Sequence, residues 1–225
     1  MIEQFENKII NADCLDILKQ LPDKCIDLVL TDPPYGMSYQ SGWREEKYNK
    51  IDNDDTLDWL PCFLEELKRV SKDDAIWYIF CSWHKVDVFK TELEKVKNVK
   101  NILIWNKNNF GSGDLYCDYA PKYEMIMFCN DKKPLNGKRL PNVLNYAKTD
   151  NLLHPTQKPI DLFACLIDKG SKENDVVFDP FSGSGTTAVA CHNLKRRFIC
   201  IEKDFDYWKA SCKRLEEHQK QLTLF

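Results

Sequence analysis

The chain has 225 residues, 43% of them hydrophobic and 30% charged, and a formal net charge of -3 at pH 7. This length fits one large domain, and the composition is typical of a globular protein with a sizeable core. A strongly basic protein is excluded, so any nucleic-acid site would have to be a local basic patch. The longest apolar run, 75–81, is far short of the ~20 residues that a membrane span needs, and no signal-like segment is present. We therefore expect a cytoplasmic protein without a membrane partner.

Ten cysteines are scattered along the chain, and none forms a Cys-x-x-Cys pair. Several lie in apolar runs such as 198–201, as expected of small buried hydrophobic residues in a reducing compartment. None of the four histidines stands at a metal-ligand spacing from a cysteine. The sequence predicts neither a disulfide framework nor a metal site.

Apolar periodicity predicts strands and helices in alternation along the chain. The expected strands cover residues 8–13, 26–31, 75–80, 101–105, 123–129, 176–178 and 198–201. The expected helices cover residues 57–71, 86–96, 160–168, 186–194 and 205–219, after a short helical turn at 16–21. This alternation predicts an α/β protein with a doubly wound, mostly parallel sheet, and we expect one domain over residues 1–225.

Four residues, Asp32-Pro33-Pro34-Tyr35, close the buried strand 26–31. The two prolines fix φ and remove two backbone donors, which leaves the Pro33 carbonyl without a ladder partner beside the Asp32 carboxylate. Two acceptors and the Tyr35 ring at the carboxyl end of a strand suit a planar ligand that carries an amino group. A rigid turn with an Asp cap is the alternative.

A glycine-rich turn, Asp-Pro-Phe-Ser-Gly-Ser-Gly-Thr-Thr at 179–187, joins a predicted strand to a predicted helix. Its glycines let the backbone approach a ligand, and the helix N-terminus offers free N–H groups. Glu202 ends the next strand, seventeen residues after Gly185, where a carboxylate can accept hydrogen bonds from ribose hydroxyls. An adenosine-containing cofactor is therefore expected. A nucleotide-triphosphate loop is excluded because Gly-Lys-Ser/Thr is missing, and the late position of the turn argues against a dinucleotide fold.

Taken in this order, the motifs resemble the DNA amino-methyltransferases that methylate adenine N6 or cytosine N4, in the subgroup with Asp-Pro-Pro-Tyr before the glycine-rich motif. The resemblance rests on five segments: Asn11-Ala12-Asp13-Cys14, Asp32 to Tyr35, Trp105-Asn106-Lys107, His154-Pro155-Thr156-Gln157-Lys158-Pro159, and 179–187. It implies a Rossmann-like, mostly parallel sheet of seven strands with one antiparallel strand and a permuted motif order. It also implies S-adenosylmethionine as cofactor and S-adenosylhomocysteine as product.

The resemblance implies a role for each matching residue. The catalytic residues are Asp32, Pro33, Pro34 and Tyr35. The methionine part of the cofactor is held by Asp179, Phe181, Ser182, Gly183, Gly185 and Thr186. The cofactor's ribose lies on Glu202, its adenine amine on Asp13, and its carboxylate near His154, Thr156 and Lys158. Other roles for single residues stay open: a helix cap for Asp13, a solvated helix start for Lys158 and a surface acid for Glu202.

The implied reaction is direct in-line methyl transfer to a base that has left the duplex, with no covalent intermediate. Asp at the first motif position resembles adenine enzymes, because cytosine-N4 enzymes of this subgroup more often carry Ser there. Cytosine N4, RNA or a protein amide as acceptor, an inactive DNA-binding module and a nicotinamide dehydrogenase are the competing hypotheses.

Double-stranded DNA is the expected partner, and two segments are candidates for contacting it. The loop 36–56 contains Trp43 and Arg44 and follows the proline-rich motif directly. The short insert 130–151 is a candidate target-recognition segment, with Lys132, Lys133, Lys138 and Arg139 as phosphate contacts. Ordinary solvated loops are the alternative for both. A homodimer and a companion restriction endonuclease are left open by the resemblance.

Overall fold

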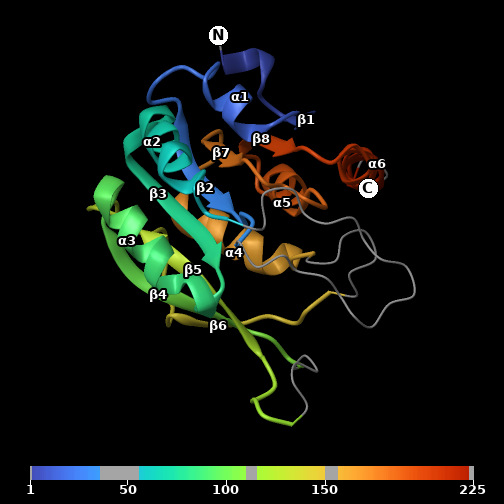
Figure 1. The fold of residues 1–225 in the computed structure, drawn as a ribbon. Helices are drawn as coiled ribbons and strands as arrows, with labels where there is room; N and C mark the ends of the chain where they lie inside the picture. Colours follow the sequence, from blue (N-terminus) through green and yellow to red (C-terminus); the bar gives the residue numbers. More distant parts are fainter. Residues whose placement is uncertain (1, 36–55, 110–115, 150–156, 223–225) are drawn as a thin grey trace.

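The computed structural model describes residues 2–35, 56–109, 116–149 and 157–222 (Figure 1). Its eight-stranded sheet has the order β1-β8-β7-β2-β3-β5-β4-β6. The strands are β1 (Lys8–Asn11), β2 (Ile26–Thr31), β3 (Ser71–Cys81), β4 (Val99–Asn106), β5 (Tyr123–Cys129), β6 (Val143–Asn145), β7 (Val176–Asp179) and β8 (Arg197–Glu202). The pairs of β5 with β3 and with β4 are antiparallel, and every other pair is parallel.

The predicted fold class is confirmed, with one strand more than the seven expected. The additional strand, β6, has only three residues and pairs with β4 at the edge of the sheet. Three residues are too few to show the alternation that reveals a strand in a sequence. β3 also begins earlier than predicted, at Ser71, because its polar first residues carry no hydrophobic signal.

Helices cover both faces of the sheet, which gives three layers (Figure 1). The helices are α1 (Cys14–Leu18), α2 (Leu60–Val70), α3 (Val86–Val96), α4 (Ile160–Gly170), α5 (Thr186–Asn193) and α6 (Phe205–Leu222), with 3-10 turns at Ile2–Gln4 and Trp83–Lys85. The first three pack in one core cluster and the last three in the other. All six residues of β2 are buried, with Val29 in the first cluster and Leu28 and Leu30 in the second. Burial on both faces explains why this strand is apolar almost throughout.

The topology brings two distant parts of the sequence to one edge of the sheet. β2 and β7 are parallel neighbours, with Val29 opposite Phe178. Asp32 follows the carboxyl end of β2, and the glycine-rich turn follows the carboxyl end of β7. Both motifs therefore leave the sheet side by side, at the carboxyl edge where open α/β sheets bind ligands.

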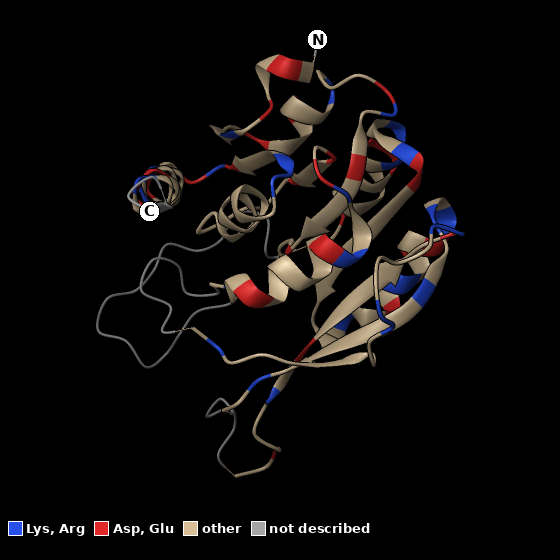
Figure 2. Cartoon of the chain, turned by 180° about the vertical axis from the view of Figure 1, so that it is seen from behind, with Lys and Arg blue, Asp and Glu red and all other residues tan. Residues whose placement is uncertain are grey.

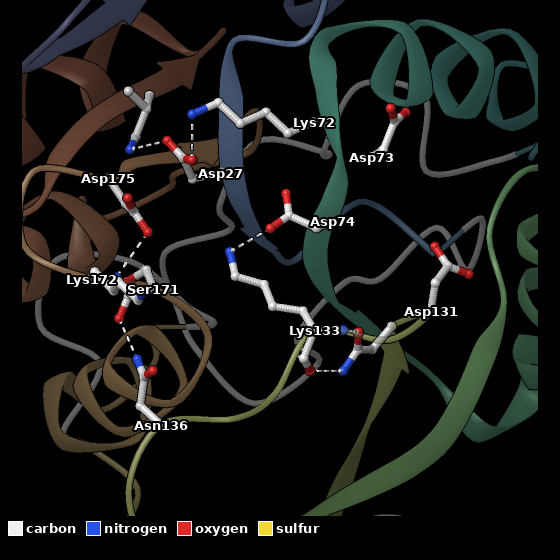
Figure 3. A network of polar contacts seen from close by, with 12 residues as sticks. Asp27, Lys72, Asp73, Asp74, Asp131, Lys133, Asn136, Ser171, Lys172 and Asp175 are labelled. Carbon is white, nitrogen blue, oxygen red and sulfur yellow. Dashed lines mark hydrogen bonds and ion pairs between the residues drawn. The ribbon is translucent and has the colours of Figure 1, made fainter.

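The reversed direction of β5 carries the segment after it to the opposite, amino edge of the sheet. There Lys133 Nζ lies 3.9 Å from Asp74 Oδ2, as Figure 3 shows, and Asp131 pairs with Lys97 at 3.0 Å. Ile79 lies opposite Thr31 in the register of β2 and β3. Asp74 is therefore six residues below the level of Asp32, or roughly 20 Å at ~3.3 Å per residue.

Acidic and basic positions are intermixed along the chain (Figure 2). This agrees with a net charge of only -3. Within the described ranges, no helix is long and apolar enough to cross a membrane.

Candidate active site

The Asp32 carboxylate has a partner on each oxygen. The Tyr35 hydroxyl donates to Oδ1, and the Lys158 ammonium donates to Oδ2. The Tyr35 ring packs edge-on against Phe89, with 6.3 Å between the ring centroids. In this arrangement the Tyr35 hydroxyl points at Asp32, whereas the sequence indicated a role for the ring of this residue only.

Lys158 connects Asp32 to a second partly buried acid. Its Nζ lies 3.3 Å from Glu124 Oε2, and Lys107 Nζ lies 2.7 Å from Glu124 Oε1. The Lys158 side chain is only 7% exposed, and its Nζ lies 5.1 Å above the centre of the Phe80 ring. Two carboxylates and two ammonium groups thus alternate along the carboxyl edge, from the end of β2 across β3 to β5 and β4. Sequence reasoning missed Glu124, although a single acid in the apolar strand β5 is a signal for a buried partner.

The protonation equilibria of this network follow from burial and pairing. Burial raises the pKa of Asp32, and the Lys158 ammonium opposes that shift. Burial, together with the Asp32 charge, raises the pKa of Tyr35 well above its usual value. Burial would also raise the pKa of Glu124, but the ammonium groups of Lys158 and Lys107 outweigh it and the net shift is downward. Glu124 is therefore a stable anion at neutral pH.

Asp179 organises the glycine-rich turn from inside. Its Oδ1 accepts a hydrogen bond from the Phe181 N–H at 3.2 Å, and its Oδ2 accepts one from the Thr187 hydroxyl. Its side chain is buried, and burial raises its pKa to about 7. Both oxygens thus accept hydrogen bonds from residues of the turn itself, so Asp179 stabilises the conformation of the glycine-rich turn.

Gly185 is required for packing as well as for conformation. Its φ is +75°, and it caps the N-terminus of α5. A Cβ at this position would lie 3.0 Å from Ser211 Cβ on α6 and 3.2 Å from Ile9 Cδ1 on β1. The sequence predicted that the glycines admit a ligand, and at Gly185 the close neighbours are α6 and β1.

Thr186, the next residue, ties the turn to Lys158. Its hydroxyl donates to the Lys158 carbonyl at 3.2 Å, while Arg214 donates to the same hydroxyl at 3.2 Å. Lys158 therefore contacts Asp32 through its side chain and the glycine-rich turn through its backbone. The two predicted motifs meet at this residue.

The turn and the end of β8 offer groups that fit an adenosine-type cofactor. Ser182 Oγ is buried without a hydrogen-bond partner among the described residues. Glu202 Oε2 accepts a hydrogen bond from the Gly183 N–H at 2.8 Å, and Oε1 accepts one from the Asp204 N–H at 2.9 Å. Burial raises the pKa of Glu202. An unused buried hydroxyl next to a desolvated acid is the kind of donor set that a polar ligand completes.

Phe181 forms an aromatic wall beside the turn. Its ring centroid lies 5.6 Å from that of Trp59 and 5.5 Å from that of Phe63. Both partners belong to the start of α2, which the sequence analysis did not connect with the turn. Asp13 caps α1 by accepting from the Leu15 N–H at 2.9 Å, and its Oδ2 lies 3.6 Å from Lys203 Nζ. This helix-cap role was the alternative for Asp13, and it leaves the second carboxylate oxygen beside the end of β8.

Four of the remaining predicted residues are not described by the structure, and the four predicted basic residues of the insert 130–151 are not brought to this edge. Trp43, Arg44, His154 and Thr156 lie outside the described residues. Lys132 and Lys133 follow β5 at the amino edge, because β5 runs opposite to its neighbours. Lys138 and Arg139 lie near the C-terminal end of α4, where Lys169 Nζ donates to the Lys138 carbonyl at 2.7 Å. That helix end also faces the amino edge, since it leads into the start of β7.

Comparison with known proteins gives the same assignment as the site. The sequence profile of the DNA methylase family N6_N4_Mtase matches residues 26–143 and 135–213. The Type II methyltransferase M.HinfI of Haemophilus influenzae is 32% identical over 96% of this chain and 70% of its own. The DNA adenine methyltransferase YhdJ of Escherichia coli (strain K12) is 27% identical over 92% of this chain and 82% of its own.

A solved structure supports the match over nearly the whole fold. The M1.HpyAVI–SAM complex is 28% identical, covers 92% of this chain and 99% of its own, and superposes with a TM-score of 0.72. The chain belongs to the N6/N4 family of S-adenosylmethionine-dependent DNA methyltransferases.

Proposed function

We propose that this protein methylates adenine N6 in double-stranded DNA. The observation that carries the proposal is the meeting of the Asp32 motif and the glycine-rich turn on adjacent strands, with Lys158 in contact with both. An acceptor for an exocyclic amine and a cradle for a methyl donor thus share one edge of the sheet.

The described residues divide the donor site into three parts. Ser182 and the turn around Gly183 would hold the methionine part, Glu202 the ribose and Phe181 a face of the bound molecule. Asp13, at the end of β1 next to β8, would reach the adenine ring. When bound, S-adenosylmethionine supplies an electrophilic methyl group on a sulfonium. His154 and Thr156 are proposed to complete this site.

The protein's own contribution is to prepare the amine. The N6 lone pair of adenine is delocalised into the ring, so the amine is a weak nucleophile. Hydrogen bonds from its two hydrogens to the Asp32 carboxylate and the Pro33 carbonyl favour a pyramidal nitrogen with a localised lone pair. As positive charge develops on that nitrogen, the Asp32 carboxylate, whose side chain is 17% exposed, stabilises it. Pro34 keeps both acceptors in a fixed geometry.

Adenine is favoured over cytosine by the acid in the motif and by one relative. Asp32 stands where adenine enzymes of this subgroup carry Asp, and YhdJ is named as a DNA adenine methyltransferase. M.HinfI, a Type II methyltransferase, favours a companion restriction endonuclease. Methylation of cytosine N4 is the second candidate, because the family includes both reactions.

The DNA surface is proposed from position along the carboxyl edge. The base must leave the duplex to reach Asp32, and the loop 36–56 with Trp43 and Arg44 directly follows the catalytic motif. Lys132, Lys133, Lys138 and Arg139 could contact DNA only if the duplex also extended past the amino edge or a second subunit took part. We propose one catalytic domain over residues 1–225, with the insert 130–151 as an auxiliary segment.

Mass spectrometry of nucleosides tests this proposal. The protein is incubated with unmethylated plasmid and genomic DNA and with S-adenosylmethionine labelled with deuterium on the methyl group, and the DNA is then digested. We expect deuterated N6-methyl-2′-deoxyadenosine and no labelled 2′-deoxycytidine. Labelled N4-methyl-2′-deoxycytidine would support the second candidate, and the absence of label from the DNA would contradict DNA as the substrate.

A further inference from the structure

We infer that Glu124 is a positioning residue. It offers the Lys158 ammonium a second carboxylate partner, so that Asp32 becomes free to accept hydrogen bonds from the target amine. The inference rests on the proposed function, because it concerns how Asp32 becomes available to a base. Glu124 is a partly buried acid of β5 that the methyl transfer itself does not require.

The need for such a residue follows from the occupancy of Asp32. Tyr35 donates to one carboxylate oxygen and Lys158 to the other, so the protein's own donors engage the atoms that the amine must reach. An amine on Asp32 Oδ2 competes directly with the ammonium of Lys158. Each carboxylate oxygen has two lone pairs, so an amine on Oδ2 would share that oxygen with Lys158 unless the ammonium shifts, and a shift would free all of Oδ2 for the amine.

Glu124 provides the place to which Lys158 can shift. Its Oε2 is buried, and no hydrogen bond from any described residue reaches it, although Lys158 Nζ is only 3.3 Å away. In this position Oε2 has only the longer ion pair with Lys158, and a short movement of the ammonium would turn it into a hydrogen bond. Moving Lys158 from one carboxylate to the other keeps a buried cation paired throughout.

Lys107 keeps the charge of the network balanced when Lys158 moves from Asp32 to Glu124. It holds the other oxygen of Glu124 at 2.7 Å, so Glu124 remains an anion in either position of Lys158. The four charged groups sum to zero, and this sum does not change when Lys158 moves. The Phe80 ring beneath the Lys158 ammonium offers a surface along which the cation can slide.

The test is a double-mutant cycle of Glu124 and Lys158, with steady-state methyl transfer to plasmid DNA as the readout. E124Q removes the second anion and leaves Lys158 with Asp32 as its remaining carboxylate. We expect the KM for DNA to rise about tenfold, the effect of one charge-assisted hydrogen bond, with little change in S-adenosylmethionine affinity. E124D should restore part of the wild-type KM.

The Lys158 background separates positioning from structure. In K158M there is no ammonium to relocate, so E124Q should have no further effect on the KM for DNA. E6Q is the matched control, because Glu6 is also a poorly exposed acid paired with a cation, Arg197 at 2.7 Å, at the amino edge. Thermal unfolding of each variant reports any general loss of stability.

The outcomes distinguish the two claims. The role of Glu124 is supported if three results occur together. The wild-type protein transfers methyl groups, E124Q raises the KM for DNA more than E6Q does, and this rise is absent in the K158M background. An E124Q effect no larger than that of E6Q, or one of equal size in K158M, overturns it. Absence of transfer by the wild-type protein instead contradicts the proposed function.

Discussion

The Thr186 hydroxyl donates a hydrogen bond to the Lys158 carbonyl at 3.2 Å. This bond joins two segments that are 28 residues apart. It sets the position of the backbone from which the Lys158 side chain reaches Asp32. The glycine-rich turn and the Asp32 carboxylate are therefore linked through contacts of a single residue, Lys158.

Replacing Thr186 by Val should weaken this connection. The change keeps the side-chain shape but removes the hydroxyl that serves Lys158 and Arg214. We expect a loss of about 1–2 kcal/mol in the free energy of unfolding and a several-fold rise in the KM for S-adenosylmethionine. T186S retains the hydroxyl and should behave much more like the wild-type protein. Wild-type behaviour of T186V, or a loss seen in T186S alone, would contradict the role of the hydroxyl.

Replacing Tyr35 by Phe separates the two properties of this side chain. Y35F keeps the ring but removes the donor to Asp32. We expect kcat to fall by about tenfold, because one hydrogen bond to a charged group is lost. Y35A also removes the ring, whose face we expect to stack on the extruded base, and should therefore lose considerably more. Equal kcat values for the two variants would assign the whole effect to the hydroxyl and leave no role for stacking.

The raised pKa of Asp179 predicts a pH-dependent stability. Burial raises this pKa to about 7 from its usual value of 3.8. The folded protein then binds more protons than the unfolded chain, so this contribution to stability is complete below about pH 4 and is lost as the pH rises through about 7. The slope is at most ~1.4 kcal/mol per pH unit. Urea unfolding of wild type and D179N between pH 4 and 8 measures it, and D179N should lack this part of the slope. Parallel curves for the two proteins would contradict the assignment.

Replacing Gly185 by Ala should destabilise the protein through both conformation and packing. The residue has a φ of +75°, and a new Cβ would meet Ser211 Cβ at 3.0 Å. We expect a loss of about 2 kcal/mol or more in the free energy of unfolding, measured in urea. In an S211G background the clash is relieved but the strained φ is not. The penalty of G185A should therefore shrink there without vanishing, and an unchanged penalty would remove the packing explanation.

The sequence was sufficient for the long, strongly patterned elements and for the two motifs. The strand 26–31 and the helix 86–96 have the predicted limits, because burial on one or two faces leaves a clear period. β6 could not be predicted, since its three residues gain their strand conformation only by pairing with β4. The same holds for the polar start of β3, which the neighbouring strand β2 orders.

Only those residues of the site that belong to a recognisable sequence motif could be predicted. Asp32 and the glycine-rich turn were identified from strand ends and turn residues, and their adjacency follows from the strand order. The contact of Lys158 with Glu124 depends on how β5 is threaded beside β3, which periodicity does not specify. The direction of β5 likewise decides that Lys133 lies at the amino edge, although its charge alone favoured a DNA contact.

The most direct test of the central claim is the paired measurement of methyl transfer and S-adenosylmethionine binding in D32A. The Asp32 carboxylate is proposed to accept the target amine, while the donor is held by the glycine-rich turn and β8. We expect D32A to lose methyl transfer to DNA by about 10³-fold or more while calorimetric titration shows donor binding preserved. Turnover of D32A at the wild-type rate, with donor binding intact, would contradict the assignment of Asp32 and with it the proposed reaction geometry.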